Sequence, residues 1–463
     1  MNLALNLLYA AERVPDRVAL VADDRRLTYS DLRERAARIA SGLTARGVRP
    51  GDRVACVLQN EPETVELYWG CQWLGAVIVP LSHRVPEADL AYCIDDAGAA
   101  VVLREPGEVA ELVAQAEHAG AFDLDEHEPS IQLYTSGTTG RPKGVPRSHR
   151  AERAGGFSQT LHHGLHPRHR TLGVMPLYHT MGIHSLLAAA VVGGCYVAQS
   201  SWDPAQALEV IGAERIDSLY LAPTLYFDLV HHPRLADTDV SSVRAVAYAG
   251  APMTAALVEK VAAAFEPEIF VNHYGSTEIY TFSVQRAQRA KPGCAGRAAL
   301  NARLRLDPAD EGEILCHMSS DEAFDGYWNR PDADEKAIRD GWYHTGDVGR
   351  LDEDGDLWVV GRVDDMVVSG GENIHPVEIE DVLVRAPGVR EVAVVGAADD
   401  RLGQRVVACI VADEGVTADD LDAFCLGSAS LARFKRPREY RFVAELPKSP
   451  SGKILRRMLR EGE

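Results

Sequence analysis

The sequence predicts an α/β protein with a large, multi-layered N-terminal domain and a small α+β C-terminal domain. Its 463 residues exceed the size at which single cores stop growing, about 250–300 residues, so more than one domain is expected. Strand and helix patterns alternate through most of the chain, which is typical of sheets covered by helices. The pattern changes near Asp364, and we therefore place an N-terminal domain at 1–363 and a C-terminal domain at 364–463.

The alternation begins close to the N-terminus. Ser30 is a candidate N-cap, apolar residues follow at helical spacing, and Gly47 is a stop signal, so a helix is expected between them. A buried strand at 53–58, a helix at 63–74 and a strand at 76–80 follow. Further strands and helices are expected at 170–175, 204–214, 216–221, 253–265 and 268–272.

The C-terminal part has a different pattern. Pro376 favours the start of a helix, because proline fits the first helical position. Strands are expected near 389–395 and 405–411, and a second helix near 417–425. The sequence has no repeat and no long linker, so the two parts should meet across a short hinge.

The composition is that of an ordinary soluble protein, with 46% apolar and 25% charged residues. A formal net charge of -20 repels nucleic acid and anionic lipid, so we expect neither as a partner. The eight cysteines are scattered without a Cys-x-x-Cys pair, which indicates neither zinc nor disulfides. The N-terminus lacks the basic region of a signal peptide, and the longest nearly apolar run, 186–198, is too short for a bilayer, so a cytoplasmic protein is expected.

Residues 134–144 combine hydroxyls, glycines and a lysine directly after an apolar run. Glycines let backbone N–H groups turn toward phosphate oxygens, serine and threonine hydroxyls add neutral donors, and Lys143 adds positive charge. Lys143 is followed by Gly144 rather than by serine or threonine, so the segment is not a P-loop of the Walker type. The segment predicts a loop that binds a polyphosphate.

This loop resembles the signature loop of the adenylate-forming superfamily, which contains acyl-CoA synthetases, carrier-protein adenylation domains and luciferases. Six further segments match that superfamily in order: 175–179, 274–278, 341–347, 361–365, 369–373 and 447–453. Among its members the chain is most similar to aryl-CoA ligases of the 4-chlorobenzoate type, through 175–179, 361–379 and 434–437. The resemblance implies two sheets with helices and a small β subdomain in the N-terminal domain, and a mobile C-terminal domain.

The resemblance implies an ATP-dependent acid–thiol ligase. A thiolate cannot expel oxide from a carboxylate, so the acid is first converted to acyl-AMP with release of pyrophosphate, and the acyl group then passes to the thiol of CoA. ATP, Mg²⁺ and CoA are the implied cofactors and cosubstrates, acting on a small-molecule carboxylic acid. Three alternatives remain open: an enzyme that loads the phosphopantetheine of a carrier protein, a medium-chain fatty acyl-CoA synthetase, and a non-catalytic nucleotide- or acyl-binding paralogue.

Similarity to the family assigns roles to individual residues. Lys453 bridges the carboxylate and the α-phosphate during adenylation, Glu278 with Thr138 holds Mg²⁺, and His179 is a catalytic candidate beside the acid. Asp347 and Arg362 lie at the ribose and Tyr274 at the adenine. The implied ATP-binding residues are Thr135, Ser136, Gly137, Thr138, Thr139, Gly140, Lys143, Gly250, Ala251, Asn272, Tyr274, Gly275, Ser276, Thr277, Asp347 and Arg362.

The second step in the family uses a rotation of the small domain about an aspartate, at the position of Asp364. The implied contacts to CoA or its pantetheine arm are Gly370, Gly371, Glu372, Lys435 and Arg436. Leu402 stands where close relatives often carry a tryptophan, which leaves a carrier protein open as the acceptor. The oligomer expected is a monomer or a homodimer.

Alignment of the flanking motifs places the acid in a mixed, partly aromatic pocket. The expected lining is Phe157, His179, Thr180, Met181, Tyr220, Ala249, His273, Gly275, Tyr280 and Thr281. An amino acid would need a buried carboxylate to pair with its ammonium, and the neighbouring helices offer only Asp228. We therefore expect a benzoate-like acid, with His273 and Tyr280 able to hydrogen-bond a ring substituent, although a satisfied packing role is the more common one for any single residue of this kind.

Overall fold

The computed structural model describes residues 2–115, 120–121, 123–135, 141–370, 372–428, 431–448 and 454–460. The chain forms two compact units. The first unit contains Met1–Leu304 and Cys316–Tyr343, and the second contains Arg305–Leu315 and His344–Glu463. The domain boundary expected between residues 363 and 364 stays a prediction.

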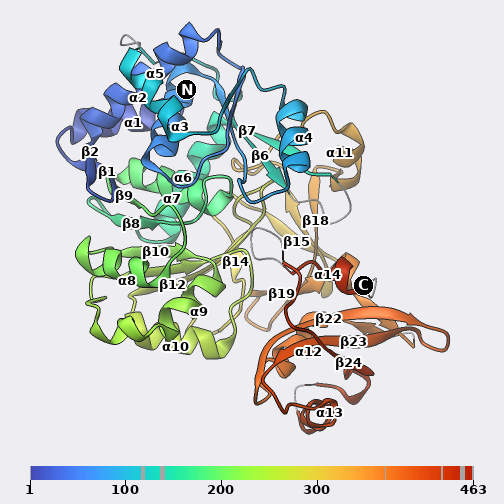
Figure 1. Cartoon of the computed structure of the whole chain (residues 1–463). Coiled ribbons are helices and arrows are strands. Elements are labelled where there is room, and N and C mark those ends of the chain that lie inside the picture. Colours follow the sequence, from blue (N-terminus) through green and yellow to red (C-terminus); the bar gives the residue numbers. More distant parts are fainter. Residues whose placement is uncertain are drawn as a thin grey trace. The chain divides into compact units, whose positions relative to one another are not determined.

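The first unit contains a nine-stranded sheet whose centre is parallel (Figure 1). Its order is β14-β13-β12-β11-β10-β8-β9-β1-β2. The strands are β1 (Val18–Ala22), β2 (Arg25–Thr28), β8 (Arg170–Gly173), β9 (Cys195–Ala198), β10 (Ser218–Leu221), β11 (Ala245–Tyr248), β12 (Ile269–Tyr274), β13 (Ser283–Gln285) and β14 (Arg297–Ala298). β8 lies between β9 and β10. The chain passes from β8 to β9 on one side and then crosses to β10 on the other side, so the strand order reverses between β8 and β10.

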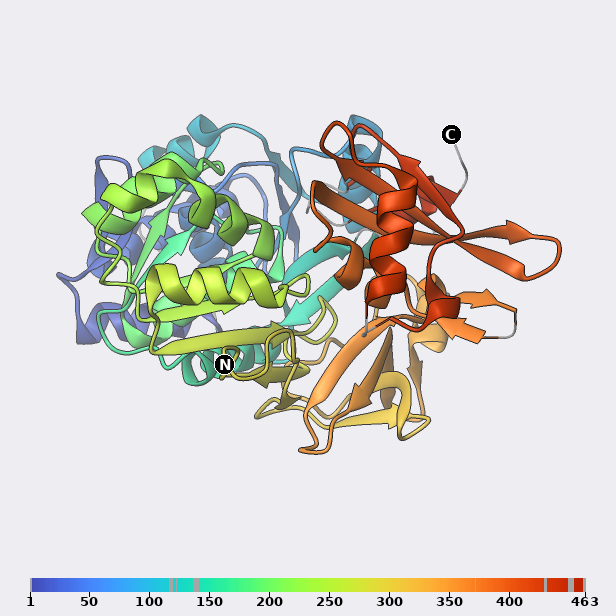
Figure 2. The same cartoon turned by 90° about the horizontal axis from the view of Figure 1, so that it is seen from below.

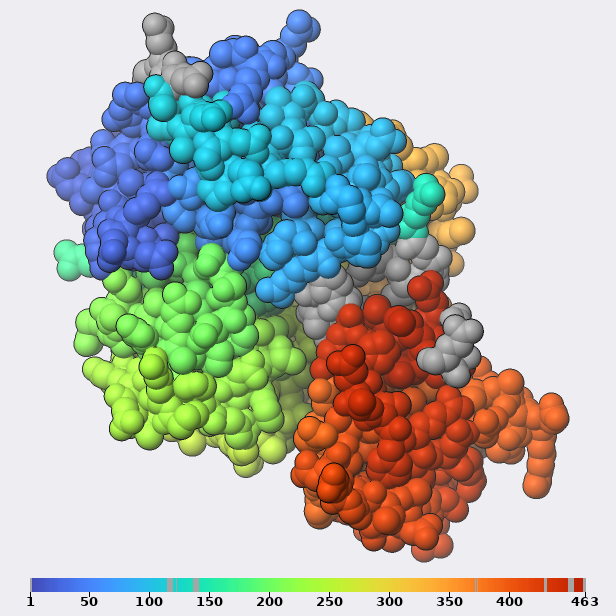
Figure 3. All heavy atoms as spheres, viewed as in Figure 1, coloured from blue at the N-terminus to red at the C-terminus, as the bar shows by residue number. Residues whose placement is uncertain are grey.

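Helices cover both faces of this sheet. One face carries α8 (Pro204–Ala213), α9 (Pro223–His231) and α10 (Ala255–Phe265), which bury their apolar sides in one cluster with β10 and β11. Figure 2 shows these three helices as a layer, and their outer sides form the green part of the surface in Figure 3. The other face packs against α7 (Thr180–Val192), which is paired with α6 (His149–His162).

A second sheet in the first unit has the order β5-β3-β4-β6-β7, parallel except for β7. Its strands are β3 (Arg53–Cys56), β4 (Val77–Pro80), β5 (Val101–Leu103), β6 (Pro129–Thr135) and β7 (Lys143–Ser148). The helices of this region are α1 (Ala4–Arg13), α2 (Tyr29–Ala45), α3 (Pro62–Leu74), α4 (Glu87–Ala97) and α5 (Pro106–Gln115). Side chains of α1, α2, α3, α5 and α7 share one apolar core, which joins the two sheets into layers.

The helix expected after Ser30 is present, but its N-cap was wrong by two residues. Thr28 is the cap: its hydroxyl accepts the N–H of Asp31 at 3.1 Å, and the Asp31 carboxylate accepts the N–H of Thr28 at 2.9 Å. This reciprocal capping box satisfies two backbone donors at once, which places Ser30 inside the helix. Gly47 follows the helix with a φ of 89°, as a stop signal requires.

A five-stranded sheet contains β15 (Leu304–Asp307), β16 (Glu311–His317), β17 (Ile338–Arg339), β18 (Trp342–Leu351) and β19 (Leu357–Arg362). Helix α11 (Pro331–Ala337) precedes β17. In β18 the residues up to Tyr343 belong to the first unit, and the following residues, which pair with β19, belong to the second.

The C-terminal sheet of the second unit has the order β21-β20-β23-β22, with β24 on β23. Its elements are β20 (Val367–Ser369), β21 (Glu372–Ile374), α12 (Pro376–Leu383), β22 (Val389–Asp399), β23 (Gly403–Ala412), α13 (Ala418–Gly427), β24 (Glu439–Phe442) and α14 (Arg456–Arg460). Helices α12 and α13 share one apolar core with the sheet. The expected elements at 376, 389–395, 405–411 and 417–425 are all present, and the predicted fold class is confirmed.

None of the described helices combines the length and the apolar composition that crossing a bilayer requires.

Candidate active site

The candidate residues of the first unit gather at the carboxyl ends of the parallel strands. β8 ends just before the 175–179 segment, β11 ends before Ala249, and β12 ends at Tyr274. Ligands of open α/β sheets bind at this edge, at the point where the strand order reverses. Here that point lies between β8 and β10, and Tyr220 lies on β10. The topology therefore brings segments that are distant in the sequence to one edge.

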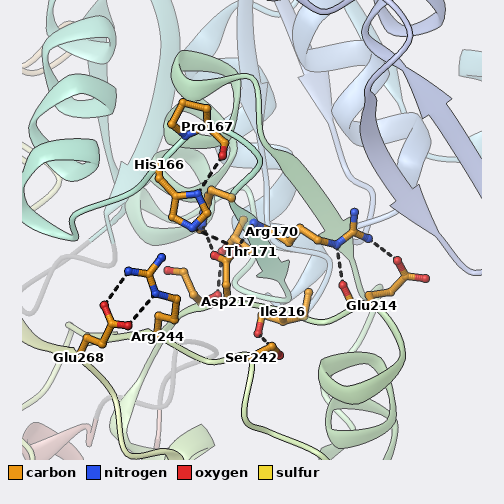
Figure 4. A network of polar contacts seen from close by, with 12 residues as sticks. His166, Pro167, Arg170, Thr171, Glu214, Ile216, Asp217, Ser242, Arg244 and Glu268 are labelled. Atoms are coloured by element: carbon orange, nitrogen blue, oxygen red, sulfur yellow. Dashed lines mark hydrogen bonds and ion pairs between the residues drawn. The ribbon is translucent and has the colours of Figure 1, made fainter.

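The opposite edge of the same sheet is held by ion pairs (Figure 4). Asp217 precedes β10 and accepts the N–H of Arg170, the first residue of β8, at 3.1 Å. Arg244 and Glu268 precede β11 and β12 and form a bidentate pair at 2.9 and 2.6 Å. Arg170 also pairs with Glu214. These groups satisfy one another, so this edge serves the stability of the sheet.

The phosphate-binding segment begins and ends on one hairpin. β6 and β7 are antiparallel, with Thr135 opposite Lys143. Five predicted ATP-binding residues, Ser136, Gly137, Thr138, Thr139 and Gly140, lie outside the described residues, so their roles stay predictions. The Thr135 hydroxyl is buried and has no partner in the described part of the chain.

Lys143 and Glu278 are linked through a tyrosine that sequence analysis did not single out. The Tyr327 hydroxyl donates to Oε1 of Glu278 at 2.6 Å, and Lys143 Nζ lies 3.8 Å from the centre of the Tyr327 ring. Burial raises the pKa of Tyr327, so the hydroxyl keeps its proton and remains a donor. Burial lowers the pKa of Lys143, and the Glu278 charge acts in the opposite direction. Tyr327 thereby orients both charged groups.

Glu278 lies on a closed turn. The Ser276 hydroxyl accepts the N–H groups of Glu278 and Ile279 at 3.2 and 3.3 Å, and the Ser276 N–H donates to the Ile279 carbonyl at 3.0 Å. A Cβ at Gly275 would lie 1.9 Å from the carbonyl oxygen of Tyr280, so only glycine fits there. Glu278 itself is 6% exposed. A fixed, slightly exposed carboxylate is a suitable oxygen ligand for Mg²⁺.

Other predicted nucleotide residues lie just after β11 or on β12. Gly250 and Ala251 are exposed, and Gly250 has a φ of 84°. The Asn272 amide is buried and donates to the carbonyl of Cys294 at 2.8 Å. Tyr274 packs edge-on against Phe282, with ring centres 5.2 Å apart. Their contacts with ATP stay predictions.

Several predicted pocket residues are brought together. Met181, Tyr220 and Ala249 belong to one buried apolar cluster. The rings of Tyr220 and His273 are 5.5 Å apart. His184, which sequence analysis missed, packs edge-on against Tyr280 at 4.2 Å and has no hydrogen-bond partner among the described residues. Phe157 differs from these residues because it is 44% exposed on α6, and its place in the pocket stays a prediction.

A buried hydrogen-bonded chain passes through His273. Thr281 donates its hydroxyl proton to Glu322 at 2.7 Å. His273 Nε2 must therefore be the protonated nitrogen that donates to Thr281 Oγ1 at 2.9 Å, and its Nδ1 faces Nε2 of His163 at 3.4 Å. Both ring nitrogens of His273 thus have protein neighbours. Burial lowers the pKa of His273 to about 3, so the ring is neutral near pH 7.

Glu322 is a buried carboxylate that sequence analysis also missed. It is 0% exposed and burial raises its pKa. It is 41 positions from Thr281, so no local signal could place it near the pocket. Asp228, the one acidic residue singled out near the pocket, instead accepts the indole N–H of Trp202 at 2.8 Å.

His179 and Thr180 lie at the start of α7. His179 is the residue before the helix, and its Nε2 is buried without a partner in the described part of the chain. Burial lowers the pKa of His179 to about 4, so this ring is also neutral. A neutral imidazole offers a donor and an acceptor but no charge.

In the second unit, Asp347 and Arg362 lie opposite each other on β18 and β19. Arg362 Nη1 donates to Asp347 Oδ1 at 2.9 Å, and the Asp347 N–H donates to the Thr345 hydroxyl at 3.0 Å. Asp364 lies in a short 3₁₀ turn, Val363–Asp365, where its carbonyl accepts from Arg460 at 3.0 Å. This unit therefore contains an oriented carboxylate beside the segment that is expected to act as a hinge.

The residues expected to contact CoA have their own partners. Gly370 has a φ of 62° and donates its N–H to the Leu402 carbonyl at 2.8 Å, and Glu372 begins β21. Lys435 pairs with Glu378 at 2.5 Å, and Arg436 pairs with Asp422 at 2.7 Å. A phosphate would have to compete with these carboxylates. Gly371 and Lys453 lie outside the described residues.

A cluster of three aspartates lies in the turn between β18 and β19. Asp352, Asp354 and Asp356 place carboxylate oxygens within 4.8 Å of one another. Asp352 accepts the N–H groups of Asp354 and Asp356 at 3.0 and 2.9 Å, so it organises the hairpin itself.

Comparison with known proteins gives two family matches. Residues 7–328 match the family described as AMP-binding enzyme. Residues 378–453 match the AMP-binding enzyme C-terminal domain. The resemblance to the adenylate-forming superfamily is thereby confirmed over most of the chain.

Relatives of similar length act on different acids. A feruloyl-CoA synthase of Amycolatopsis sp is 35% identical over 96% of this chain and 96% of its own. A 4-chlorobenzoate–CoA ligase of Arthrobacter sp is 33% identical over 100% and 95%, and a long-chain fatty acid–CoA ligase of Mycobacterium tuberculosis is 33% identical over 95% and 93%. The o-succinylbenzoate CoA synthetase of Bacillus subtilis, solved with an acyl-adenylate, has a TM-score of 0.90 at 28% identity, covering 99% of this chain and 98% of that one.

Proposed function

This chain belongs to the AMP-binding enzyme family, and we propose that, as an AMP-forming acid–CoA ligase, it acts on a single-ring aromatic carboxylic acid. The observation that carries the choice of acid is the group of rings at the carboxyl edge of the large sheet, formed by Tyr220, His273 and Tyr280 with His184. These side chains are 3% exposed or less. They favour a short, flat acyl group over a long flexible one.

In the first step, the carboxylate oxygen attacks the α-phosphate of ATP and pyrophosphate leaves. Two anions must approach, so the protein contributes positioning and positive charge. Lys143 and the 136–140 loop bind the phosphates, and Lys453 bridges the acid and the α-phosphate. Glu278, with Thr138, would hold Mg²⁺, which supplies neutralising charge to the phosphates. Asp347 and Arg362 bind the ribose, and Tyr274 contacts the adenine.

In the second step, the CoA thiol attacks the acyl-adenylate carbonyl and AMP leaves. The C-terminal domain, 364–463, rotates about Asp364 and removes Lys453 from the site. Gly370, Gly371 and Glu372 then line the path of the pantetheine arm. Lys435 and Arg436 meet the phosphates of CoA once their bonds to carboxylates are exchanged.

The buried Thr281–Glu322 pair supports an acid with a polar substituent. Glu322 is fully buried, and Thr281, Ser158 and Asn301 are its hydrogen-bonding neighbours. A carboxylate can accept about four hydrogen bonds, so a hydroxyl or amino group on the ring would supply a further donor. Hydroxybenzoate-like acids are therefore favoured over benzoate itself.

The test is an ATP–pyrophosphate exchange screen. Wild-type protein is assayed with benzoate, its hydroxy and amino derivatives, medium-chain fatty acids and amino acids. The proposal requires the highest kcat/KM among the substituted benzoates. A higher value for fatty acids would refute the aromatic assignment and favour the medium-chain alternative.

The acceptor is tested separately. Acyl-adenylate prepared with the best acid is offered to CoA and to a phosphopantetheinyl carrier protein, and thioester is measured. CoA is the expected acceptor, because the relatives by name transfer to CoA. Thioester on the carrier protein alone would identify a carrier-loading enzyme, the alternative that Leu402 leaves open.

A further inference from the structure

Arg147 is a buried cation next to the candidate site. Among the described lysines and arginines, only Arg147 is fully buried, with a side chain 0% exposed. It lies on β7, four residues after Lys143, and its backbone pairs with Ile131 of β6. A charge at such a position is costly unless it is paired and hydrogen-bonded.

Its first partners are Glu152 and Tyr280. Arg147 Nε donates to Oε1 of Glu152 at 2.6 Å, and Glu152, in the first turn of α6, is also 0% exposed. The guanidinium carbon lies 3.4 Å from the centre of the Tyr280 ring, which gives a stacked cation–π contact. These contacts hold the guanidinium in one plane.

Its remaining bonds go to the turn that carries Glu278. Arg147 Nη1 donates to the carbonyl oxygens of Thr277 at 3.1 Å and of Glu278 at 3.2 Å. The turn is 130 positions away in the sequence, so these bonds are a tertiary link between it and the β6–β7 hairpin. One side chain therefore contacts α6, a predicted wall of the acid pocket and the backbone of the predicted metal ligand.

We propose that Arg147 is a positioning residue that fixes the Glu278 turn against the hairpin carrying Lys143. It thereby holds the backbone of Glu278, the residue that would bind Mg²⁺, in one position. A guanidinium provides N–H donors in fixed directions within one plane, whereas an ammonium does not, so lysine cannot reproduce all of these bonds. The inference rests on the proposed function through the role of Glu278.

Two variants test it. Arg147→Met/Glu152→Met removes the ion pair as a whole, because replacing a buried pair by apolar residues is often tolerated, whereas removing one partner leaves a lone charge. Arg147→Lys keeps the charge but loses the planar donor set. Glu278→Gln serves as the reference for loss of the metal ligand.

The measurement is ATP binding by isothermal titration calorimetry, once with saturating Mg²⁺ and once with EDTA. The dissociation constant in EDTA divided by the dissociation constant with Mg²⁺ reports how strongly Mg²⁺ supports ATP binding. Both Arg147 variants are expected to lower this ratio by about tenfold, as expected for groups that orient metal ligands, while ATP binding in EDTA stays unchanged. Melting temperatures establish that each variant is folded.

The control is Arg170→Met/Glu214→Met, which removes a partly buried ion pair at the amino ends of the strands of the nine-stranded sheet, together with the Arg26–Glu214 contact. It should leave the ratio at the wild-type value. If either folded Arg147 variant also keeps the wild-type ratio, Arg147 does not position the turn. If wild-type binding itself does not depend on Mg²⁺, or Glu278→Gln keeps the dependence, the metal role in the proposed function fails first.

Discussion

At the scale of single residues, the candidate acid pocket is polar but carries few charges. Burial lowers the pKa of His179 to about 4 and of His273 to about 3, and it also lowers the pKa of His184. Neutral histidines do not attract the carboxylate to the wrong end of the pocket, and His179 and His184 have ring nitrogens without partners among the described residues. They also connect the pocket to the pH dependence of stability.

We predict that the protein loses stability as pH falls from about 7 to about 5. Unfolded histidines titrate near pH 6.5, whereas His273 and His179 stay neutral in the folded protein until about pH 3 and 4. The unfolded chain therefore binds more protons in this window, and each buried histidine removes up to about 1.4 kcal/mol of unfolding free energy per pH unit. Thermal unfolding across this range measures the slope. His273→Gln should flatten it, and the exposed His127→Gln should not.

Tyr327→Phe should weaken adenylation while preserving the fold. The variant keeps the ring beside Lys143 and removes only the hydroxyl that donates to Glu278. A hydrogen bond to a charged group contributes about 1.5–3 kcal/mol, so kcat/KM for pyrophosphate exchange should fall about 10- to 100-fold. Tyr226→Phe is the control, because that hydroxyl bonds to the carbonyls of Leu219 and Ala247. Equal losses in both variants would assign Tyr327 a purely structural role.

At the scale of elements, the helices and strands that local sequence signals predicted are present, although the structure contains many more. Pro62–Leu74 and Pro376–Leu383 begin with proline at the first position, and the expected helices coincide with them. The start of α2 was misplaced, because Thr28 and Ser30 are both acceptable caps by residue type. Only the bonds to Asp31 distinguish them.

The capping box gives a direct test of that difference. Thr28→Ala should lower the unfolding free energy by about 1 kcal/mol, because it leaves an N–H at the start of α2 without its partner. Ser30→Ala, inside the helix, should change it little, since alanine is the better helix former. Urea denaturation of the two variants measures both values. A larger loss from Ser30→Ala would contradict the assignment of the cap.

At the scale of the whole molecule, the sequence identified the site segments but not their connections. The nucleotide motifs were recognisable because they are contiguous, as in 134–144 and 274–278. Tyr327, Glu322 and Arg147 were missed, because each acts through a partner far away in the chain. The distance from Arg147 to Thr277 is 130 positions, and no periodicity spans it.

Lys453→Ala should abolish acyl-adenylate formation and spare thioester formation from preformed acyl-adenylate. The lysine charge is needed while the carboxylate and phosphate anions approach each other, and not when the thiol attacks. The two half-reactions are assayed separately with the best acid. Equal loss in both would contradict a lysine that leaves the site between the steps.

Asp364→Pro should have the opposite effect. Proline fixes φ, so it should block a rotation centred on this residue while leaving the adenylation arrangement intact. Pyrophosphate exchange should persist, and the rate of thioester formation from acyl-adenylate should fall. Asp400→Pro, in another exposed turn of the second unit, is the control for general damage. An unchanged thioester rate would remove Asp364 from the hinge.

The two edges of the large sheet differ in how freely their amino acids can be substituted. Ion pairs such as Arg244–Glu268 hold the amino ends of the strands, whereas Tyr220, Ala249 and His273 lie toward the carboxyl ends. Under the proposed function, substitutions at the carboxyl edge alter which acid is accepted while the ion pairs at the amino ends stay intact. A lineage, or a directed-evolution library restricted to that edge, can diversify its substrates on an unchanged scaffold.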